Sequence, residues 1–121
     1  MHMPACNDAL RDRLSRYREI KITVTGRKSG RAISIPVWFV FEDEKVYLLP
    51  GFGSQTQWYK NLLETPSVRI NARGAEAEFD VVPVTDPEQV ASVIEKFRGK
   101  YGGDGVKLYS KLDVVVRAQA R

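Results

Sequence analysis

Two residue types that build many catalytic and metal sites are almost missing from this sequence of 121 residues. Cys6 is the only cysteine, so neither an internal disulfide nor a cysteine metal cluster can form. His2 is the only histidine, and it stands beside Met3 in a stretch typical of a leader or tag remnant. These absences disfavour a zinc site and a histidine-based catalytic triad, and we expect no bound metal.

Long apolar runs are missing as well. No segment approaches the roughly 18 apolar residues that a membrane-spanning helix needs, and the N-terminus lacks the apolar core of a signal peptide. The lone cysteine fits a reducing compartment, so we expect a cytoplasmic protein. Hydrophobic residues make up 43% and charged residues 28%, a globular composition whose length suits a single domain over residues 1–121.

The charge balance is mildly basic, with 19 cationic and 15 acidic residues and a net charge of +4. Such a chain could meet nucleic acid, an anionic membrane surface or an anionic small molecule. The total does not choose among these partners, so the position of the cations must decide.

Alternating apolar and polar residues predict a mainly β domain with short helices. About six mostly antiparallel strands are expected, the first three as a meander, and closure into a small barrel would remove their exposed edges. Pro36 lies inside the second strand and marks an edge, a bulge or an approach by something other than a strand. The expected strands cover 20–25, 32–41, 46–49, 68–71, 76–84 and 114–116, and the expected helices lie within 1–18, at 57–64 and at 86–99. A polar loop is expected over 101–111.

The turn after the first strand carries an unusual concentration of cations. Arg27, Lys28 and Arg31 stand with the Ser29 hydroxyl in six residues that begin at Gly26. Most cationic turns are simply solvated, but this one combines glycine-freed backbone, a hydroxyl and charge-assisted donors, which are the parts of a phosphate site. It is not a Walker loop, because neither that spacing nor a strand-to-helix transition is present.

A second loop supports the first. Gly51, Gly53 and Ser54 lead into the expected helix at 57–64, and a glycine-containing loop that opens a helix presents backbone N–H groups to an anion. Trp58 lies in the first turn of that helix, where core packing and the wall of a ligand site are equally good interpretations.

Four segments together resemble the deazaflavin-dependent nitroreductase family, a branch of the flavin-binding split β-barrel superfamily related to pyridoxamine-phosphate oxidases. They are T-G-R-K-S-G at 25–30, P-V-W at 36–38, W-Y-K-N-L at 58–62 and P-S-V at 66–68. The resemblance covers residues 20–85 well. It implies a split β-barrel that binds the 8-hydroxy-5-deazaflavin coenzyme, factor 420, and transfers a hydride from it to an electron-poor acceptor such as a quinone, an enone or a nitro compound.

The resemblance also implies the contacts. The phosphate and acidic tail of the coenzyme would lie on Arg27, Lys28, Ser29 and Arg31. Its ring would lie against Pro36, Val37 and Trp38, with Leu49, Gly51, Gly53, Ser54, Gln57 and Trp58 on the other side. Tyr101 and Tyr109 are the candidates to donate a proton to the acceptor, although packing is the commoner role of such tyrosines.

Several alternatives stay open. Gln57 and the Leu49–Gly53 segment depart from the pattern of many relatives, so FMN in place of the deazaflavin is one alternative, and a non-enzymatic carrier of either is another. A small barrel that binds nucleic acid through exposed Trp58 and Tyr59 is a third, but the cations gather in one turn and form no stripe, so we expect no nucleic acid. The basic N-terminal helix could touch a membrane but is expected to pack on the barrel, and the assembly could be a monomer or a homodimer.

Overall fold

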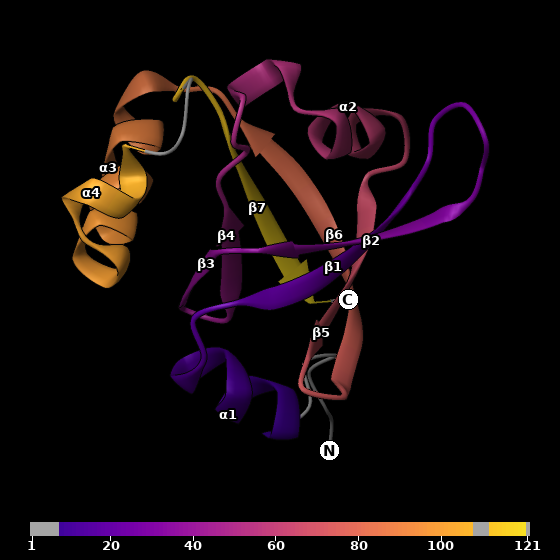
Figure 1. Ribbon diagram of the computed structural model, residues 1–121, viewed down its shortest axis with the longest axis horizontal. Coiled ribbons are helices and arrows are strands. Elements are labelled where there is room, and N and C mark those ends of the chain that lie inside the picture. The colour runs from indigo at the N-terminus through magenta and orange to yellow at the C-terminus, as the bar shows by residue number, and fades with distance from the viewer. Residues whose placement is uncertain (1–7, 108–111, 121) are drawn as a thin grey trace.

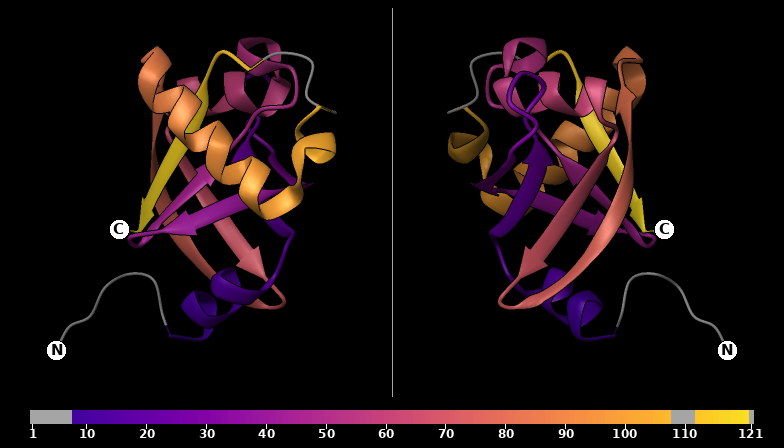
Figure 2. Two further views of the ribbon diagram at one scale, coloured as in Figure 1. Left: turned by 90° about the vertical axis from the view of Figure 1, so that its left-hand side faces the viewer. Right: turned by 90° about the vertical axis from the view of Figure 1, so that its right-hand side faces the viewer.

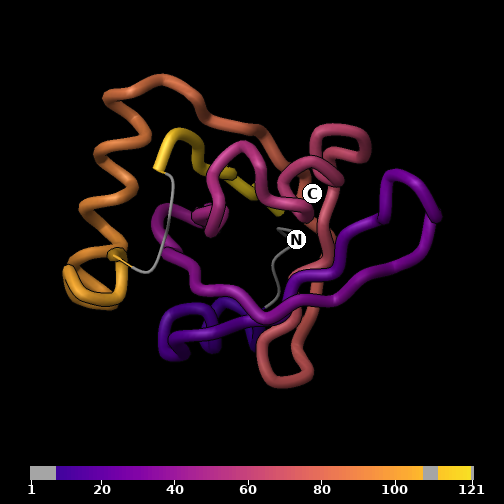
Figure 3. Tube along the Cα trace, turned by 45° about the horizontal axis from the view of Figure 1, so that its top comes forward, coloured from indigo at the N-terminus to yellow at the C-terminus, as the bar shows by residue number. Residues whose placement is uncertain are grey.

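A computed structural model describes residues 8–107 and 112–120 of the chain. Seven antiparallel strands form one sheet that curls into a split barrel, with helices at its ends and on one side (Figures 1 and 3). The strands are β1 (Ile20–Thr25), β2 (Ala32–Val37), β3 (Phe39–Glu42), β4 (Lys45–Leu48), β5 (Ser67–Ala72), β6 (Ala75–Val84) and β7 (Val115–Ala120). The helices are α1 (Asp8–Arg16), the single turn η1 (Gly53–Gln55), α2 (Gln57–Glu64), α3 (Pro87–Tyr101) and α4 (Gly103–Val106).

The expected strand over 32–41 is in fact two strands, which is why the sheet has seven strands and not about six. The order in the sheet is β2-β1-β5-β6-β7-β4-β3, so β2 and β3 form its opposite edges although only Trp38 separates them in sequence. β2 pairs with β1, whereas β3 pairs with β4. Trp38 therefore joins the two edges of the sheet covalently and bends the sheet around its core.

Two apolar clusters hold this shape. The larger fills the barrel and includes Phe39, Ile70 and Phe79, each with an exposed fraction of 0%. The smaller lies between the sheet and α3, where Val40 and Val115 meet the apolar stripe of that helix (Figure 2). Phe39 and its neighbour Val40 thus point into different clusters, so β3 is buried on both faces.

The start of α3 is the one that the sequence predicted, and local signals define it. The Asp86 carboxylate accepts a hydrogen bond from the Gln89 N–H at 3.1 Å, and Pro87 occupies the first turn. The helix continues to Tyr101, two residues beyond its expected end. The expectation of a loop over 101–111 is therefore wrong in its described part, where Tyr101 closes α3 and residues 103–106 form α4.

The N-terminal helix closes one end of the barrel, as expected. Leu10 and Leu14 are buried in the main core, and the Arg11 guanidinium binds both carboxylate oxygens of Glu44 in the β3–β4 turn. The apolar face of α1 is therefore occupied by the barrel. Within residues 8–107 and 112–120, no helix has the length and apolar character needed to cross a bilayer.

Candidate functional site

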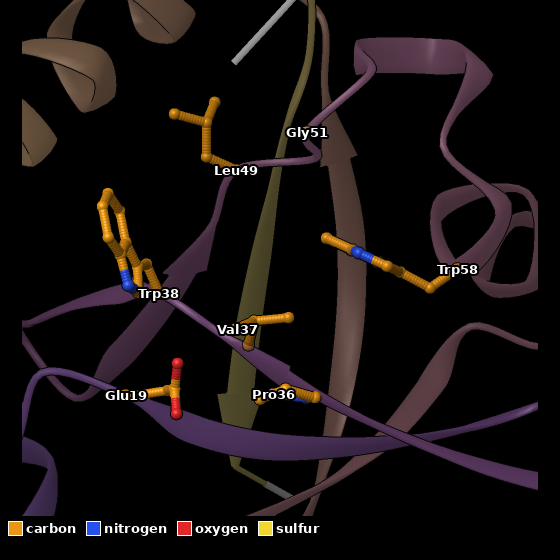
Figure 4. Close-up of a pocket in the computed structure, with 7 residues that line it drawn as sticks. All are labelled: Glu19, Pro36, Val37, Trp38, Leu49, Gly51 and Trp58. Carbon is orange, nitrogen blue, oxygen red and sulfur yellow. The ribbon is translucent and has the colours of Figure 1, made fainter. Parts of the chain in front are cut away.

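An open pocket of about 300 Å³ lies where the two edges of the sheet meet (Figure 4). Its walls come from β2, the corner after β2, the segment after β4 and the first turn of α2. The lining residues are Glu19, Pro36, Val37, Trp38, Leu49, Gly51 and Trp58, and we call this space the aromatic pocket. Six of these seven residues were predicted from the sequence to contact a coenzyme ring, so the fold brings together segments that are far apart in the chain.

The two tryptophans line the aromatic pocket from different environments. Trp58 is 8% exposed, belongs to the barrel core and also lines the pocket. The core interpretation is therefore confirmed, and contact with a ligand stays a prediction. Trp38 stacks on the Tyr101 ring with centroids 4.4 Å apart and an interplanar angle of 1°. A Cβ atom on Gly105 would come within 3.1 Å of the Trp38 indole, so α4 supports this side chain through a close backbone contact.

A second pocket of about 240 Å³ lies at the base of the cationic turn. Its lining residues are Gly26, Arg27, Lys28, Ser29, Ile33, Gln57 and Asn61, and we call it the cationic pocket. Gln57 in this pocket directly precedes Trp58 in the aromatic pocket, and both pockets draw a wall from β2. The two pockets are therefore neighbours along β2 and the start of α2.

The cationic turn is held against α2 by Arg27. Its backbone N–H and its Nη1 atom both donate to Asn61 Oδ1, at 3.1 and 2.8 Å, and its Nη2 atom donates to Gln57 Oε1 at 2.7 Å. Asn61 is 6% exposed, so these bonds satisfy a buried amide oxygen. Arg27 accordingly braces the turn, which leaves Lys28 as the exposed cation of this pocket.

The turn itself projects beyond the barrel (Figure 1). The Gly26 N–H donates to the Arg31 carbonyl at 2.8 Å, and Gly30 has a φ of 71°, a backbone conformation that favours glycine. Lys28 and Arg31 are exposed, and neither forms an ion pair with another residue in the described part of the chain. Arg31 does not line the cationic pocket, so of the four predicted anion-binding residues the structure gathers Arg27, Lys28 and Ser29.

The start of α2 adds backbone donors beside this pocket. Thr56 occupies the cap position, but its hydroxyl accepts a hydrogen bond from the Phe52 N–H at 2.8 Å and forms no cap bond to the helix. The first amides of α2 are therefore without a side-chain cap, next to Gln57 in the cationic pocket.

Gly53 and Ser54 were predicted to contact the coenzyme, and the structure places both outside the two pockets. Gly53 is buried in the η1 turn with a φ of 56°. Ser54 donates from its N–H and its Oγ to the two carboxylate oxygens of Asp113, at 3.0 and 2.8 Å. This loop is thus tied to the start of β7, and only Leu49 and Gly51 of the predicted loop residues line the aromatic pocket.

The first candidate proton donor, Tyr101, has its hydroxyl among backbone groups. It accepts a hydrogen bond from the Phe39 N–H at 3.0 Å and lies 2.7 Å from the Arg18 carbonyl oxygen. These contacts favour the packing role for Tyr101, which does not line the aromatic pocket. The second candidate, Tyr109, lies outside the described residues.

Lys100 lies next to this backbone junction. Its Nζ atom donates to the Phe39 carbonyl at 2.9 Å and stands 3.5 Å from the centre of the Phe39 ring. Burial, with a smaller contribution from the Arg18 charge, lowers the pKa of Lys100 to about 8.

Four lining residues of the two pockets were not among the predicted contacts: Glu19, Gly26, Ile33 and Asn61. Asn61 belongs to the W-Y-K-N-L segment, so its presence was visible, but only the folded turn shows that it receives Arg27. Glu19 had no signal in the sequence, since a carboxylate before a strand is ordinarily solvated. The exposed aromatic platform required by a nucleic-acid-binding barrel is contradicted, because Trp58 and Tyr59 are 8% and 5% exposed.

Solved structures share this fold at low sequence identity. A conserved hypothetical protein from Mycobacterium tuberculosis has a TM-score of 0.77 and 21% identity, covering 98% of this chain and 82% of that chain. An F420-H2 dependent reductase (FDR-A) has a TM-score of 0.67 and 18% identity, with coverages of 84% and 94%. HutZ, described as the heme storage protein from Vibrio cholerae, has a TM-score of 0.73 and 16% identity, with coverages of 96% and 90%.

These likenesses confirm the predicted split β-barrel, the fold of factor-420-dependent reductases among others. No curated protein matches the chain in sequence. Residues 11–121, however, match the model of the family described as "Uncharacterized protein conserved in bacteria (DUF2255)". The chain therefore belongs to the DUF2255 family and carries the split β-barrel fold of the deazaflavin-dependent reductases.

Proposed function

We propose that this protein is a factor-420-dependent oxidoreductase that reduces an electron-poor acceptor such as a quinone, an enone or a nitro compound. The observation that supports this proposal is the placement of the cationic pocket beside the aromatic pocket along β2 and α2. A coenzyme that joins a flat ring to an anionic tail needs both surfaces as neighbours.

The residues present fit the anionic part of the coenzyme. Lys28 and Arg31 have no internal ion pair in the described chain, Ser29 offers a hydroxyl, and α2 offers amides without a side-chain cap. Charge-assisted bonds from such donors are the ones that hold phosphates and carboxylates firmly. Arg27 would contribute chiefly by keeping the turn against Gln57 and Asn61.

The residues of the aromatic pocket fit the ring. Pro36 has no N–H to leave unsatisfied, the two indoles provide flat surfaces, and Val37 and Leu49 add aliphatic contacts. The coenzyme supplies the hydride when it is bound, and the protein would hold the ring and the acceptor in register while these walls exclude water. Because the coenzyme would supply the reactive group, the site needs no catalytic histidine or cysteine, and residues 8–107 and 112–120 contain neither.

FMN is the nearest alternative coenzyme, since it also joins a flat ring to a phosphate. The likeness to HutZ raises haem as another ligand. Haem iron usually takes histidine, methionine, cysteine or tyrosine as its axial ligand, and the only histidine, methionines and cysteine of the chain lie within residues 1–6. Tyrosine alone could serve in the described residues, which makes haem the weaker proposal.

The test is a fluorescence titration of the purified protein with factor 420, FMN and haemin in parallel. The informative variant is Lys28→Ala with Arg31→Ala, which removes two exposed charges without breaking an ion pair in the described chain. The matched control is Arg13→Ala with Lys45→Ala, which lowers the net charge equally at partly exposed positions that form no ion pair in the described chain and lie outside both pockets.

Binding of factor 420 that weakens at least tenfold in the first variant and stays within about twofold in the control would support the proposal. Turnover of the reduced coenzyme with a quinone or nitro acceptor would then separate a reductase from a carrier. Binding of FMN or haemin without factor 420 would replace the proposed coenzyme, and binding of none would end the proposal.

Assembly and location stay predictions. A homodimer is the assembly that we propose to test first, because β2 is an edge strand paired only with β1 in the described sheet. Light scattering at micromolar concentration distinguishes it from a monomer. The cytoplasmic location still rests on the lone cysteine. Peripheral membrane contact cannot use the apolar face of α1, because that face packs against the barrel.

A further inference from the structure

One acidic side chain, that of the exposed residue Glu19, stands at the rim of the aromatic pocket, whose other lining side chains carry no charge. Glu19 directly precedes β1, and its carboxylate lies between Trp38 and Pro36 at the lower rim of the pocket (Figure 4). It is the only ionisable side chain among the lining residues of this pocket. Within the described part of the chain, Glu19 forms neither an ion pair nor a side-chain hydrogen bond.

The cations that neighbour Glu19 in sequence and space are engaged elsewhere or face another depression. The Arg18 guanidinium lies 4.9 Å from the centre of the Tyr101 ring and donates to the Lys100 carbonyl at 3.0 Å. Arg73 lies 4.6 Å from the centre of the Tyr17 ring. Glu19 and Pro36 also line a second depression of about 240 Å³, together with Lys21 and Arg73. The carboxylate thus stands between a cationic depression and the aromatic pocket.

A charge at this place acts on whatever enters the pocket. Indole, valine and leucine walls displace water, and charges beside such walls are screened less than charges in bulk solvent. Any acceptor must lie against the ring of the coenzyme, and therefore close to this rim. A negative group on the acceptor would be repelled by Glu19, whereas a positive group would be attracted.

We propose that Glu19 determines the charge selectivity of the aromatic pocket, favouring cationic and neutral electron-poor acceptors over anionic ones. That these molecules accept electrons rests on the proposed reductase function. The effect of the Glu19 charge does not rest on that function, because it concerns the pocket of the free protein.

The first test uses the protein without any coenzyme. Both tryptophans of the chain line the aromatic pocket, so tryptophan emission, excited at a wavelength that tyrosine does not absorb, reports on this site. Stern–Volmer quenching by caesium, iodide and neutral acrylamide would be compared between the native protein and Glu19→Gln. Glu88→Gln, an exposed carboxamide substitution in the first turn of α3, is the matched control.

The expected result is a ratio of iodide to caesium quenching, each normalised to acrylamide, that rises about twofold in Glu19→Gln and stays unchanged in Glu88→Gln. Raising the ionic strength should reduce the difference, because the effect is electrostatic. An equal ratio in all three proteins would overturn the proposal, since it would mean that Lys21 and Arg73 already neutralise the carboxylate.

The second test uses the reduced coenzyme and nitroaromatic acceptors that differ only in a cationic, neutral or anionic substituent. Glu19→Gln should raise kcat/KM for the anionic acceptor and lower it for the cationic one, about fivefold each, with the neutral acceptor unchanged. Turnover with no change in this ranking would overturn the role of Glu19 alone. Absence of coenzyme binding would overturn the proposed function, while the quenching experiment would still decide what Glu19 does.

Discussion

The backbone N–H and the guanidinium of Arg27 share a single acceptor, the buried Oδ1 atom of Asn61. This relationship connects the cationic turn to α2 and so determines where Lys28 and Ser29 lie relative to Trp58. It also divides the cations of the turn into one brace and others that remain available to an anion.

Asn61→Ala should lower the free energy of unfolding by about 1–3 kcal/mol, because it leaves two donors of Arg27 without their acceptor. Amide hydrogen exchange in the turn from Gly26 to Arg31 should become faster. Asn61→Asp keeps the oxygen and adds a charge that Arg27 can pair with, so its stability should stay within about 1 kcal/mol of the native protein. Urea unfolding measures both, and equal stabilities for the alanine and native proteins would contradict the brace.

Tyr101→Phe distinguishes packing from proton donation. Loss of the hydroxyl leaves the Phe39 N–H without its partner, which should cost about 1–2 kcal/mol of unfolding free energy. The pH profile of kcat with a nitro or quinone acceptor should not change. Tyr47→Phe is the control, since Tyr47 is half-buried in β4 and its hydroxyl forms no bond in the described chain. A rate loss of about a hundredfold without loss of stability would restore the catalytic role.

The lowered pKa of Lys100 predicts that stability depends on pH in a definite direction. Because its pKa falls from 10.5 in the unfolded chain to about 8 in the folded protein, the unfolded state binds more protons between these values. The contribution of Lys100 is therefore fully present above pH 10.5 and is lost as the pH falls through 8. Since Lys100 is half-exposed, solvent screening reduces the effect to about 1–2 kcal/mol.

Urea unfolding of the native protein and of Lys100→Met, at pH values about one unit apart between about 7 and 10, measures this effect. The stability of the native protein relative to the variant should rise across this interval. The comparison cancels the effect of Tyr59 at the upper end of this interval. Burial, with a smaller contribution from the Asp113 charge, raises the pKa of Tyr59, so that its titration removes stability as the pH approaches and passes 10. A flat difference would show that Lys100 titrates normally.

Asp113 should control the loop that carries Gly51 to the aromatic pocket. Asp113→Ala removes both acceptors of Ser54, whereas Ser54→Ala removes only the hydroxyl bond. We expect affinity for factor 420 to fall several-fold in Asp113→Ala and about twofold in Ser54→Ala, following the loss of order in the loop. Isothermal titration measures both, and affinities in the reverse order would contradict the link between loop and pocket.

Much of the secondary structure could be predicted because its causes are local. The Asp86 cap and the apolar stripe from Val90 to Phe97 define α3. In β1, the alternation of apolar and polar residues matches the alternation of buried and more exposed positions. The aromatic and cationic residues of the site were also visible as short motifs. Their grouping into two neighbouring pockets was only implied by a resemblance, until β2 and α2 placed them together.

The sequence by itself determined most of the strands, although not the length of β7, together with the longer helices and the concentration of cations at 27–31, because these depend on neighbours in the chain. Tertiary structure alone decided that β2 and β3 separate at Trp38, because that break follows from pairing with two distant strands. It also decided that Arg27 is a brace, that Tyr101 binds backbone, and that Glu19 enters the pocket. Each of these roles depends on which acceptor, ring or cavity lies opposite in space, and residue type and spacing do not contain that information.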